Sequence, residues 1–282
     1  MALEIVSRHG CFGGTVTYYR HASSATGTLM RFSAFVPANV QNAPLLWFLS
    51  GLTCTEDNFT VKGGAYRQAA ALGLVIVAPD TSPRGADVPD DPAYDFGQGA
   101  GFYINATQAP WATHFQMERY IAQELPQVVA AELPVDMRRQ GLFGHSMGGH
   151  GALTLALKYP QQFTSISAFA PIAAPTQVPW GRKAFTGYLG SDEAAWQDHD
   201  ACVLMRRAGD RRAMPAILLD QGADDPFLHE QLRPELFEAA CAAVGQALIL
   251  RRQTGYDHGY FFVSTFIDDH LLHHAAILNQ QP

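Results

Sequence analysis

Charge is sparse in this sequence, and no part of it is strongly basic. Of the 282 residues only 16% are charged, and the formal net charge is −7. No run of Lys or Arg is longer than a pair such as Arg138-Arg139. Because binding to nucleic acid needs a clustered basic face, we expect no nucleic-acid partner.

Long apolar runs and paired cysteines are lacking as well. No segment approaches the roughly 18–20 uninterrupted apolar residues of a membrane span, so we expect no membrane insertion. The first residues do not combine a basic flank with an apolar stretch, as a secretory signal does. The 4 cysteines form no C-x-x-C pair, which is typical of free thiols in a reducing compartment. These absences predict a cytoplasmic protein without a structural zinc site.

Apolar residues, in contrast, are plentiful and are grouped into short runs. They make up 48% of the sequence, enough for one large core, so we expect a single domain over residues 1–282. Runs that end in Gly, Pro or Asp and alternate with helical patterns are typical of buried parallel strands. The expected strands cover residues 44–49, 73–78, 141–143, 165–170, 216–219 and 247–251. The expected helices cover residues 115–131 (kinked or restarted at Pro126), 149–159, 234–244 and 260–278.

The N-terminal region has a different pattern. Residues 16–20 and 30–36 alternate or are rich in aromatic side chains, which predicts an antiparallel hairpin at the start of the sheet. The fold class is therefore α/β, with a mostly parallel central sheet, an N-terminal antiparallel hairpin and helices on both faces. Residues 80–112 are rich in Gly, Pro and Asp, and we expect them to form a loop over the active site.

A candidate nucleophile lies in the G-x-S-x-G element of residues 144–148, whose serine is Ser146. A short apolar strand precedes this element and a helical pattern follows it, which is the context of a nucleophile elbow in the α/β-hydrolase fold. The alternative is a glycine-rich packing turn with an idle serine. His145 and His150 are interpreted as structural neighbours of the turn.

The base and the acid follow from the chain order Ser, Asp, His of this fold. His258 lies after the last expected strand and before the final helix, which is the usual position of the catalytic histidine in this fold. Asp225 ends a G-x-x-D turn after the preceding strand, and Asp224 is the alternative acid. His270 and His274 could share a helix face and bind a metal, but no Cys or Glu ligand accompanies them.

The oxyanion hole needs backbone N–H groups from the elbow and from the loop after an early strand. We assign these donors to Leu52 and Met147. Cys54 lies close to this loop, and we interpret it as a non-catalytic thiol near the pocket. Trp111 and Trp180 are expected in loops, where either could line the cleft.

Several blocks of sequence go beyond these general motifs and resemble the S-formylglutathione hydrolase (esterase D) family. They occupy residues 49–55, 78–85, 99–103, 143–152, 168–172, 179–181, 220–222 and 255–258. The resemblance runs nearly end to end, and it implies a catalytic triad of Ser146, Asp225 and His258. Pro226 and Gly259 depart from the family pattern, and both are expected to alter the rigidity of their loops.

The resemblance also implies a reaction, the hydrolysis of S-formylglutathione to glutathione and formate through a formyl-serine intermediate. It implies a small-molecule substrate, no metal or organic cofactor, and a homodimer. Candidate substrate-binding residues are Cys54, Lys62, Phe102 and Trp180, and Arg84 and Arg182 join Lys62 as candidates to hold the glutathione carboxylates. A general carboxylesterase of small acetyl esters, an acyltransferase and a non-catalytic binding protein are the alternatives.

Overall fold

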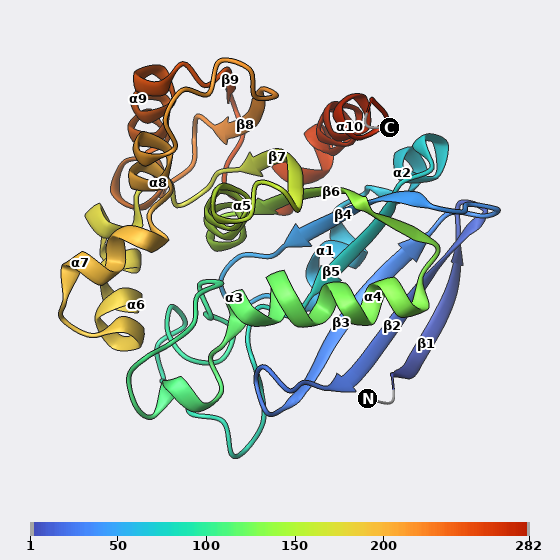
Figure 1. The fold of residues 1–282 in the computed structure, drawn as a ribbon, viewed down its shortest axis with the longest axis horizontal. Coiled ribbons are helices and arrows are strands. Elements are labelled where there is room, and N and C mark those ends of the chain that lie inside the picture. Colours follow the sequence, from blue (N-terminus) through green and yellow to red (C-terminus); the bar gives the residue numbers. More distant parts are fainter. Residues whose placement is uncertain (1–2, 281–282) are drawn as a thin grey trace.

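One nine-stranded mixed sheet organises the computed structural model, which describes residues 3–280 (Figure 1). The strand order is β1-β2-β3-β5-β4-β6-β7-β8-β9. The pairs β1–β2, β2–β3 and β3–β5 are antiparallel, and all other pairs are parallel. The strands are β1 (Glu4–Cys11), β2 (Gly14–Ala22), β3 (Leu29–Val36), β4 (Ala43–Leu49), β5 (Val75–Pro79), β6 (Val135–His145), β7 (Phe163–Phe169), β8 (Ile217–Gly222) and β9 (Leu248–Gln253).

Helices cover both faces of this sheet. Helices α1, α2 and α10 pack on one face, and α4, α5 and α8 lie on the other. The helices are α1 (Glu56–Lys62), α2 (Tyr66–Leu72), α3 (Met117–Arg119), α4 (Leu125–Glu132), α5 (Met147–Lys158), α6 (Pro179–Leu189), α7 (Glu193–Trp196), α8 (Ala201–Arg207), α9 (Pro234–Val244) and α10 (Tyr260–Leu278). The predicted fold class, with its antiparallel N-terminal hairpin and its mostly parallel sheet, is therefore confirmed.

The central strands match the expected apolar runs because these runs are buried on both sides. Every residue of β4 and of β5 is buried, including Trp47 and Phe48. Strand β1 has a largely exposed, polar sequence at the edge of the sheet, so no apolar run marked it. Gly73, expected at the start of a strand, instead ends α2 in the left-handed conformation (φ 67°), which places the start of β5 at Val75.

The α-helical part of the segment that contains Pro126 restarts at this proline, as expected, because α4 begins at Leu125 and has the proline in its first turn. A π-helical turn, Tyr120–Glu124, precedes α4 and joins it to α3, and Figure 1 shows the segment as one rod across the sheet. In this turn the N–H of Leu125 bonds to the carbonyl of Tyr120, one residue farther back than in an α-helix. The wider turn accommodates a proline that lacks an N–H.

Four loops meet at the carboxyl ends of the parallel strands. They follow β4, β6, β8 and β9, and they carry the expected oxyanion loop, Ser146, Asp225 and His258 respectively. In open α/β sheets this edge is where ligands bind. Within residues 3–280, no helix is both long and apolar enough to cross a lipid bilayer.

Candidate active site

Ser146 occupies a sharp turn between β6 and α5. Its backbone has φ 60° and ψ −119°, a conformation that residues other than glycine rarely adopt. A Cβ on Gly148 would lie 1.9 Å from the carbonyl oxygen of Leu49, and one on Gly144 would lie 2.3 Å from that of Gly148. The two glycines of the motif therefore allow the strand, the turn and the helix to pack this closely.

Asp225 and His258 come together from the loops after β8 and β9. His258 Nδ1 lies 2.6 Å from Asp225 Oδ2. The other carboxylate oxygen, Oδ1, accepts the backbone N–H of Phe227 at 2.8 Å, and the Gln221 amide donates to Oδ2 at 3.2 Å. Asp225 is buried, whereas the alternative acid, Asp224, is exposed. The structure thus brings His258 to Asp225 rather than to Asp224.

Pro226 suits the turn that holds the acid. The bond from the Phe227 N–H to the Asp225 side chain closes a three-residue turn, with Pro226 at its centre. Proline has a fixed φ and no N–H to satisfy, both of which favour this position. Gly259, the second departure from the family pattern, is the N-cap of α10 and provides no side-chain cap.

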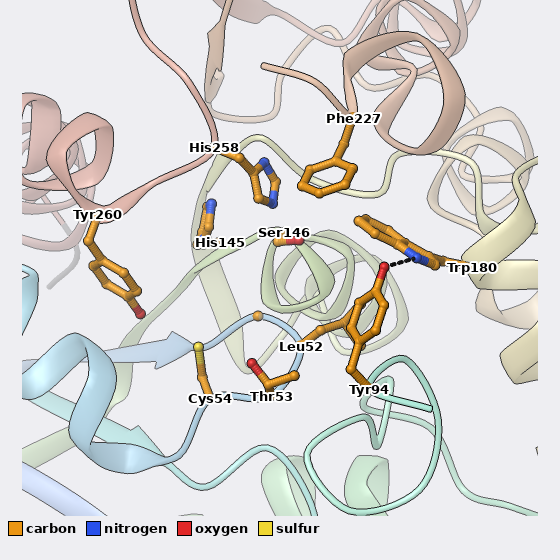
Figure 2. Close-up of a pocket in the computed structure, with 11 residues that line it drawn as sticks. Leu52, Thr53, Cys54, Tyr94, His145, Ser146, Trp180, Phe227, His258 and Tyr260 are labelled. Carbon is orange, nitrogen blue, oxygen red and sulfur yellow. Dashed lines mark hydrogen bonds between the residues drawn. The ribbon is translucent and has the colours of Figure 1, made fainter. Parts of the chain in front are cut away.

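A pocket of about 180 Å³ opens above Ser146. Figure 2 shows the imidazole of His258 over Ser146, with aromatic side chains on both sides of the pair. The lining carries no Asp, Glu, Lys or Arg and consists of Gly51, Leu52, Thr53, Cys54, Tyr94, His145, Ser146, Trp180, Phe227, His258 and Tyr260. A neutral acyl group fits such a lining better than a charged one does.

The expected oxyanion donors lie beside the serine. Met147 is the first residue of α5, so its N–H has no acceptor within the helix. In the loop after β4, the N–H groups of Thr53 and Cys54 bond to Gly99 O and Gly51 O, while that of Leu52 has no acceptor in the described chain. A Cβ on Gly51 would lie 3.1 Å from the Cβ of Ser146, so this loop passes directly against the serine. Two free N–H groups therefore flank it, as an oxyanion hole requires.

His145 lies beside the imidazole of His258. The centres of the His145 and His258 rings are 4.5 Å apart, and His145 is buried. Burial, with a smaller effect of the nearby His258, holds the pKa of His145 well below its usual range. His145 is thus a neutral packing surface for His258, in line with a structural role.

The loop of residues 80–112 packs against the loop after β4, which carries the expected oxyanion donor Leu52. Arg84 bonds to both Asp80 and the carbonyl oxygen of Cys54, the latter at 2.9 Å. Gly99 O accepts the Thr53 N–H, and the Tyr103 hydroxyl donates to Ser50 O at 2.8 Å. Arg84, Gly99 and Tyr103 therefore hold the loop after β4, and of residues 80–112, which were expected to lie over the site, Tyr94 alone lines the pocket.

The candidate substrate-binding residues fall into three groups. Cys54 and Trp180 line the pocket, although Trp180 lies in the first turn of α6 and not in a loop as expected.

The other candidates lie elsewhere. Phe102 is fully buried and does not line the pocket, and its carbonyl oxygen bonds to the His150 ring at 3.0 Å. Lys62 lines a neighbouring hollow. Trp111, in a 3-10 turn, packs against Phe96 and Tyr188 away from the pocket.

Outside the serine turn and the loop after β4, sequence reasoning missed three lining residues, Tyr94, Phe227 and Tyr260, and one residue that supports the acid. Tyr94 and Trp180 join the loop and α6 across the pocket through a 3.2 Å hydrogen bond (Figure 2). Phe227 and Tyr260 each lie two residues after a catalytic candidate, and this spacing was an available signal. Gln221 stands in one of the family blocks, so that block marked a residue that contacts the acid.

Comparisons with known proteins agree with this geometry. A family model described as a putative esterase matches residues 23–273. An S-formylglutathione hydrolase of Paracoccus denitrificans (strain Pd 1222) is 51% identical, over 99% of this chain and 99% of its own length. The chain belongs to the S-formylglutathione hydrolase family. Another member, from Mus musculus, is 48% identical over 99% of this chain and 100% of its own.

The family also includes a solved structure with the same fold. An S-formylglutathione hydrolase from Agrobacterium tumefaciens superposes with a TM-score of 0.94 at 48% identity, covering 97% of this chain and 99% of that one. The resemblance of the family blocks and the arrangement of the strands therefore lead to one family.

Proposed function

We propose that this chain hydrolyses S-formylglutathione to glutathione and formate, with Ser146 as the nucleophile. The observation that carries the proposal is the 2.6 Å contact of His258 with Asp225 above a strained serine, in a small uncharged pocket. A serine hydroxyl needs an adjacent base, and the base needs a partner that fixes its tautomer. Membership of the S-formylglutathione hydrolase family supports the choice of thioester.

The first half-reaction transfers the formyl group to the enzyme. The Ser146 oxygen attacks the formyl carbon while His258 takes the hydroxyl proton. The N–H groups of Leu52 and Met147 stabilise the oxyanion, an interaction that is worth about 3–4 kcal/mol for one donor. The carbon–sulfur bond then breaks, and glutathione leaves with the proton from His258. Asp225 stabilises the transient imidazolium.

The second half-reaction regenerates the serine. Water loses a proton to His258 and attacks the formyl-Ser146 ester, and the resulting oxyanion again faces Leu52 and Met147. Collapse returns the proton to the Ser146 oxygen and releases formate. All atoms are supplied by the thioester and water, so the reaction needs no cofactor.

We also propose that the reaction takes place in the cytoplasm. The cysteines Cys11, Cys54, Cys202 and Cys241 are all free thiols in the structure. Such thiols persist where glutathione is kept reduced, and the cytoplasm is such a compartment.

A series of acyl groups tests the proposal. We expect kcat/KM for S-formylglutathione to exceed that for S-acetylglutathione by at least about tenfold, with S-propionylglutathione lower still, because one methylene in a closed pocket is worth about 10–200-fold. Steady-state kinetics on one preparation makes the comparison. Equal values across the series, with faster turnover of 4-nitrophenyl acetate, would favour the general carboxylesterase instead.

A further inference from the structure

A second hollow adjoins the catalytic pocket on the side of Tyr260. It has a volume of about 640 Å³, and its lining consists of Lys62, Asp257, Gly259, Tyr260, Phe261 and Ser264. Tyr260 lines both the hollow and the pocket. Figure 2 shows this side chain reaching from α10 towards Cys54, at the opposite end of the pocket from Trp180. A ligand that extends past Tyr260 therefore enters the hollow.

Lys62 brings an uncommitted positive charge to this hollow. Lys158 and Lys183 are paired with Glu118 and Asp95, whereas Lys62 forms no ion pair within the described part of the chain. Its ammonium lies 6.0 Å from the centre of the Tyr260 ring. Lys62 thus keeps its charge available beside Tyr260, the residue that lines both the hollow and the pocket.

The other two candidate cations are already engaged. Arg84 bonds to the Asp80 carboxylate and to the carbonyl oxygen of Cys54. Arg182 bonds to Glu193 at 2.6 Å, and its guanidinium lies 5.2 Å from the centre of the Trp196 ring. Of the three candidates for binding a carboxylate, the structure favours Lys62.

Asp257 adds a negative charge to the same hollow. Its Oδ1 accepts the N–H of Gly259 at 2.8 Å, and no cation pairs with the carboxylate within residues 3–280. The Asp257 carboxylate and the Lys62 ammonium thus line one hollow, and within residues 3–280 neither forms an ion pair. This pair is complementary to the zwitterionic end of an amino acid, which carries one carboxylate and one ammonium.

We propose that this hollow binds the γ-glutamyl end of glutathione, with Lys62 on its α-carboxylate and Asp257 on its α-ammonium. The inference rests on the proposed function. A pocket of about 180 Å³ is small for a whole tripeptide thioester, since ligand sites commonly span about 300–1,000 Å³. The formyl group and the sulfur lie over Ser146, and the peptide continues past Tyr260.

A truncated substrate and a charge deletion test the proposal together. The variant Lys62→Met is assayed on S-formylglutathione and on N-acetyl-S-formyl-cysteinylglycine, which lacks the γ-glutamyl group and has no free amine to take the formyl group from sulfur. We expect KM for the full substrate to rise about tenfold and the KM ratio of the two substrates to approach one, because a charge-assisted contact is lost. Asp257→Asn, which still accepts the Gly259 N–H, should move the ratio in the same direction.

Arg182→Met is the matched control, because it deletes a positive charge that is already paired. It should leave the KM ratio unchanged. An equal rise of KM for both substrates in Lys62→Met, or no rise for either, would overturn the assignment of the hollow.

Binding without turnover separates this inference from the proposed function. We expect Lys62→Met to raise the Kd of S-methylglutathione, measured by calorimetry, about tenfold. If the wild-type chain failed to hydrolyse S-formylglutathione, the proposed reaction would be wrong, and an unchanged Kd would independently reject the hollow.

Discussion

Two Asp–His pairs lie in the part of the chain that the structure describes, one at the pocket and one inside the core. At the pocket, His258 meets Asp225 above Ser146. In the core, His270 Nε2 lies 3.0 Å from Asp220 Oδ2, and its Nδ1 lies 2.8 Å from the hydroxyl of Ser167. Each set thus combines a Ser, a His and an Asp: the core set is hydrogen-bonded from Ser167 through His270 to Asp220, and in the pocket set Ser146 lies beneath the imidazole that contacts Asp225.

The surroundings decide what each set can do. Ser167, His270 and Asp220 are fully buried, and Ser167 Oγ also contacts His274 Nε2 at 2.8 Å. Arg251 forms an ion pair with Asp220. Burial by itself would raise the pKa of Asp220, but the bonds from His270 and Arg251 outweigh it and lower the pKa. Because its three members are fully buried, no substrate reaches the inner set, and its hydrogen bonds fix α10 to β7 and β8.

The largest expected contrast is between the two serines. Ser146→Ala should lower kcat by about 10⁶-fold, because members of a catalytic triad act as a unit. Ser167→Ala should keep kcat within a few-fold but lower the free energy of unfolding by about 1–3 kcal/mol, since two buried imidazoles lose a partner. Steady-state kinetics and urea denaturation measure both variants. A Ser146→Ala protein with a few per cent of wild-type activity would contradict the assignment.

The acids give the next contrast. Asp225→Asn should lower kcat by about 10⁴-fold, because an amide cannot stabilise the imidazolium or hold the productive tautomer. Asp224→Asn, at the exposed neighbouring position, is the matched control and should remain within a few-fold of wild type. The reverse order of losses would identify Asp224 as the acid.

The inner acid should affect stability rather than catalysis. Asp220→Asn leaves Arg251 with one anionic partner, Asp269 at 2.6 Å, and weakens the bond from His270. We expect the free energy of unfolding to fall by about 2–3 kcal/mol, below the range for fully buried pairs because the Arg251 side chain is 32% exposed. Denaturation midpoints check the loss, and a kcat change as large as that of Asp225→Asn would remove the distinction between the two pairs.

The smallest expected effect is a change in the pH dependence of stability. Burial, aided by His273 and His270, holds the pKa of His274 well below 6.5, and burial also lowers that of His270. These imidazoles stay neutral in the folded state, while the unfolded chain binds protons below about pH 6.5. Stability should therefore be complete above that pH and fall as the pH drops.

His274→Gln removes one such group. The slope of the unfolding free energy between about pH 6 and pH 5 should decrease by up to about 1.4 kcal/mol per pH unit relative to wild type. The slope, and not the absolute stability, is the readout, because the substitution also changes packing. An unchanged slope would mean that His274 is charged in the folded protein.

Features that depend on a short stretch of neighbouring residues were predictable from the sequence. The glycines around Ser146, the G-x-x-D turn at Asp225 and the place of His258 before the last helix all depend on neighbours in the chain. Helix 234–244 was predicted to the residue because Pro234 and Gly245 mark its ends, and the last helix, expected roughly over 260–278, begins directly after Gly259.

Features that depend on distant contacts were not predictable. Tyr94 forms a hydrogen bond with Trp180, which lies 86 positions away in the sequence, and no pattern near either residue predicts this contact. Phe102, which belongs to the family block of residues 99–103, was a candidate for the pocket, but its side chain is buried in the core instead. Helix α6 was missed because its first residues, Pro179 to Gly181, have the composition of a loop.

The packing of residues 80–112 against the oxyanion loop has a consequence for changing the enzyme's acyl range. The same stretch, residues 80–112, supplies Tyr94 to the pocket wall and supports the loop of Leu52 through Arg84 and Gly99. Shortening this stretch to admit larger acyl groups would therefore also loosen an oxyanion donor. A laboratory selection for broader substrates should accumulate point substitutions at Tyr94 and Trp180 and avoid deletions in this segment.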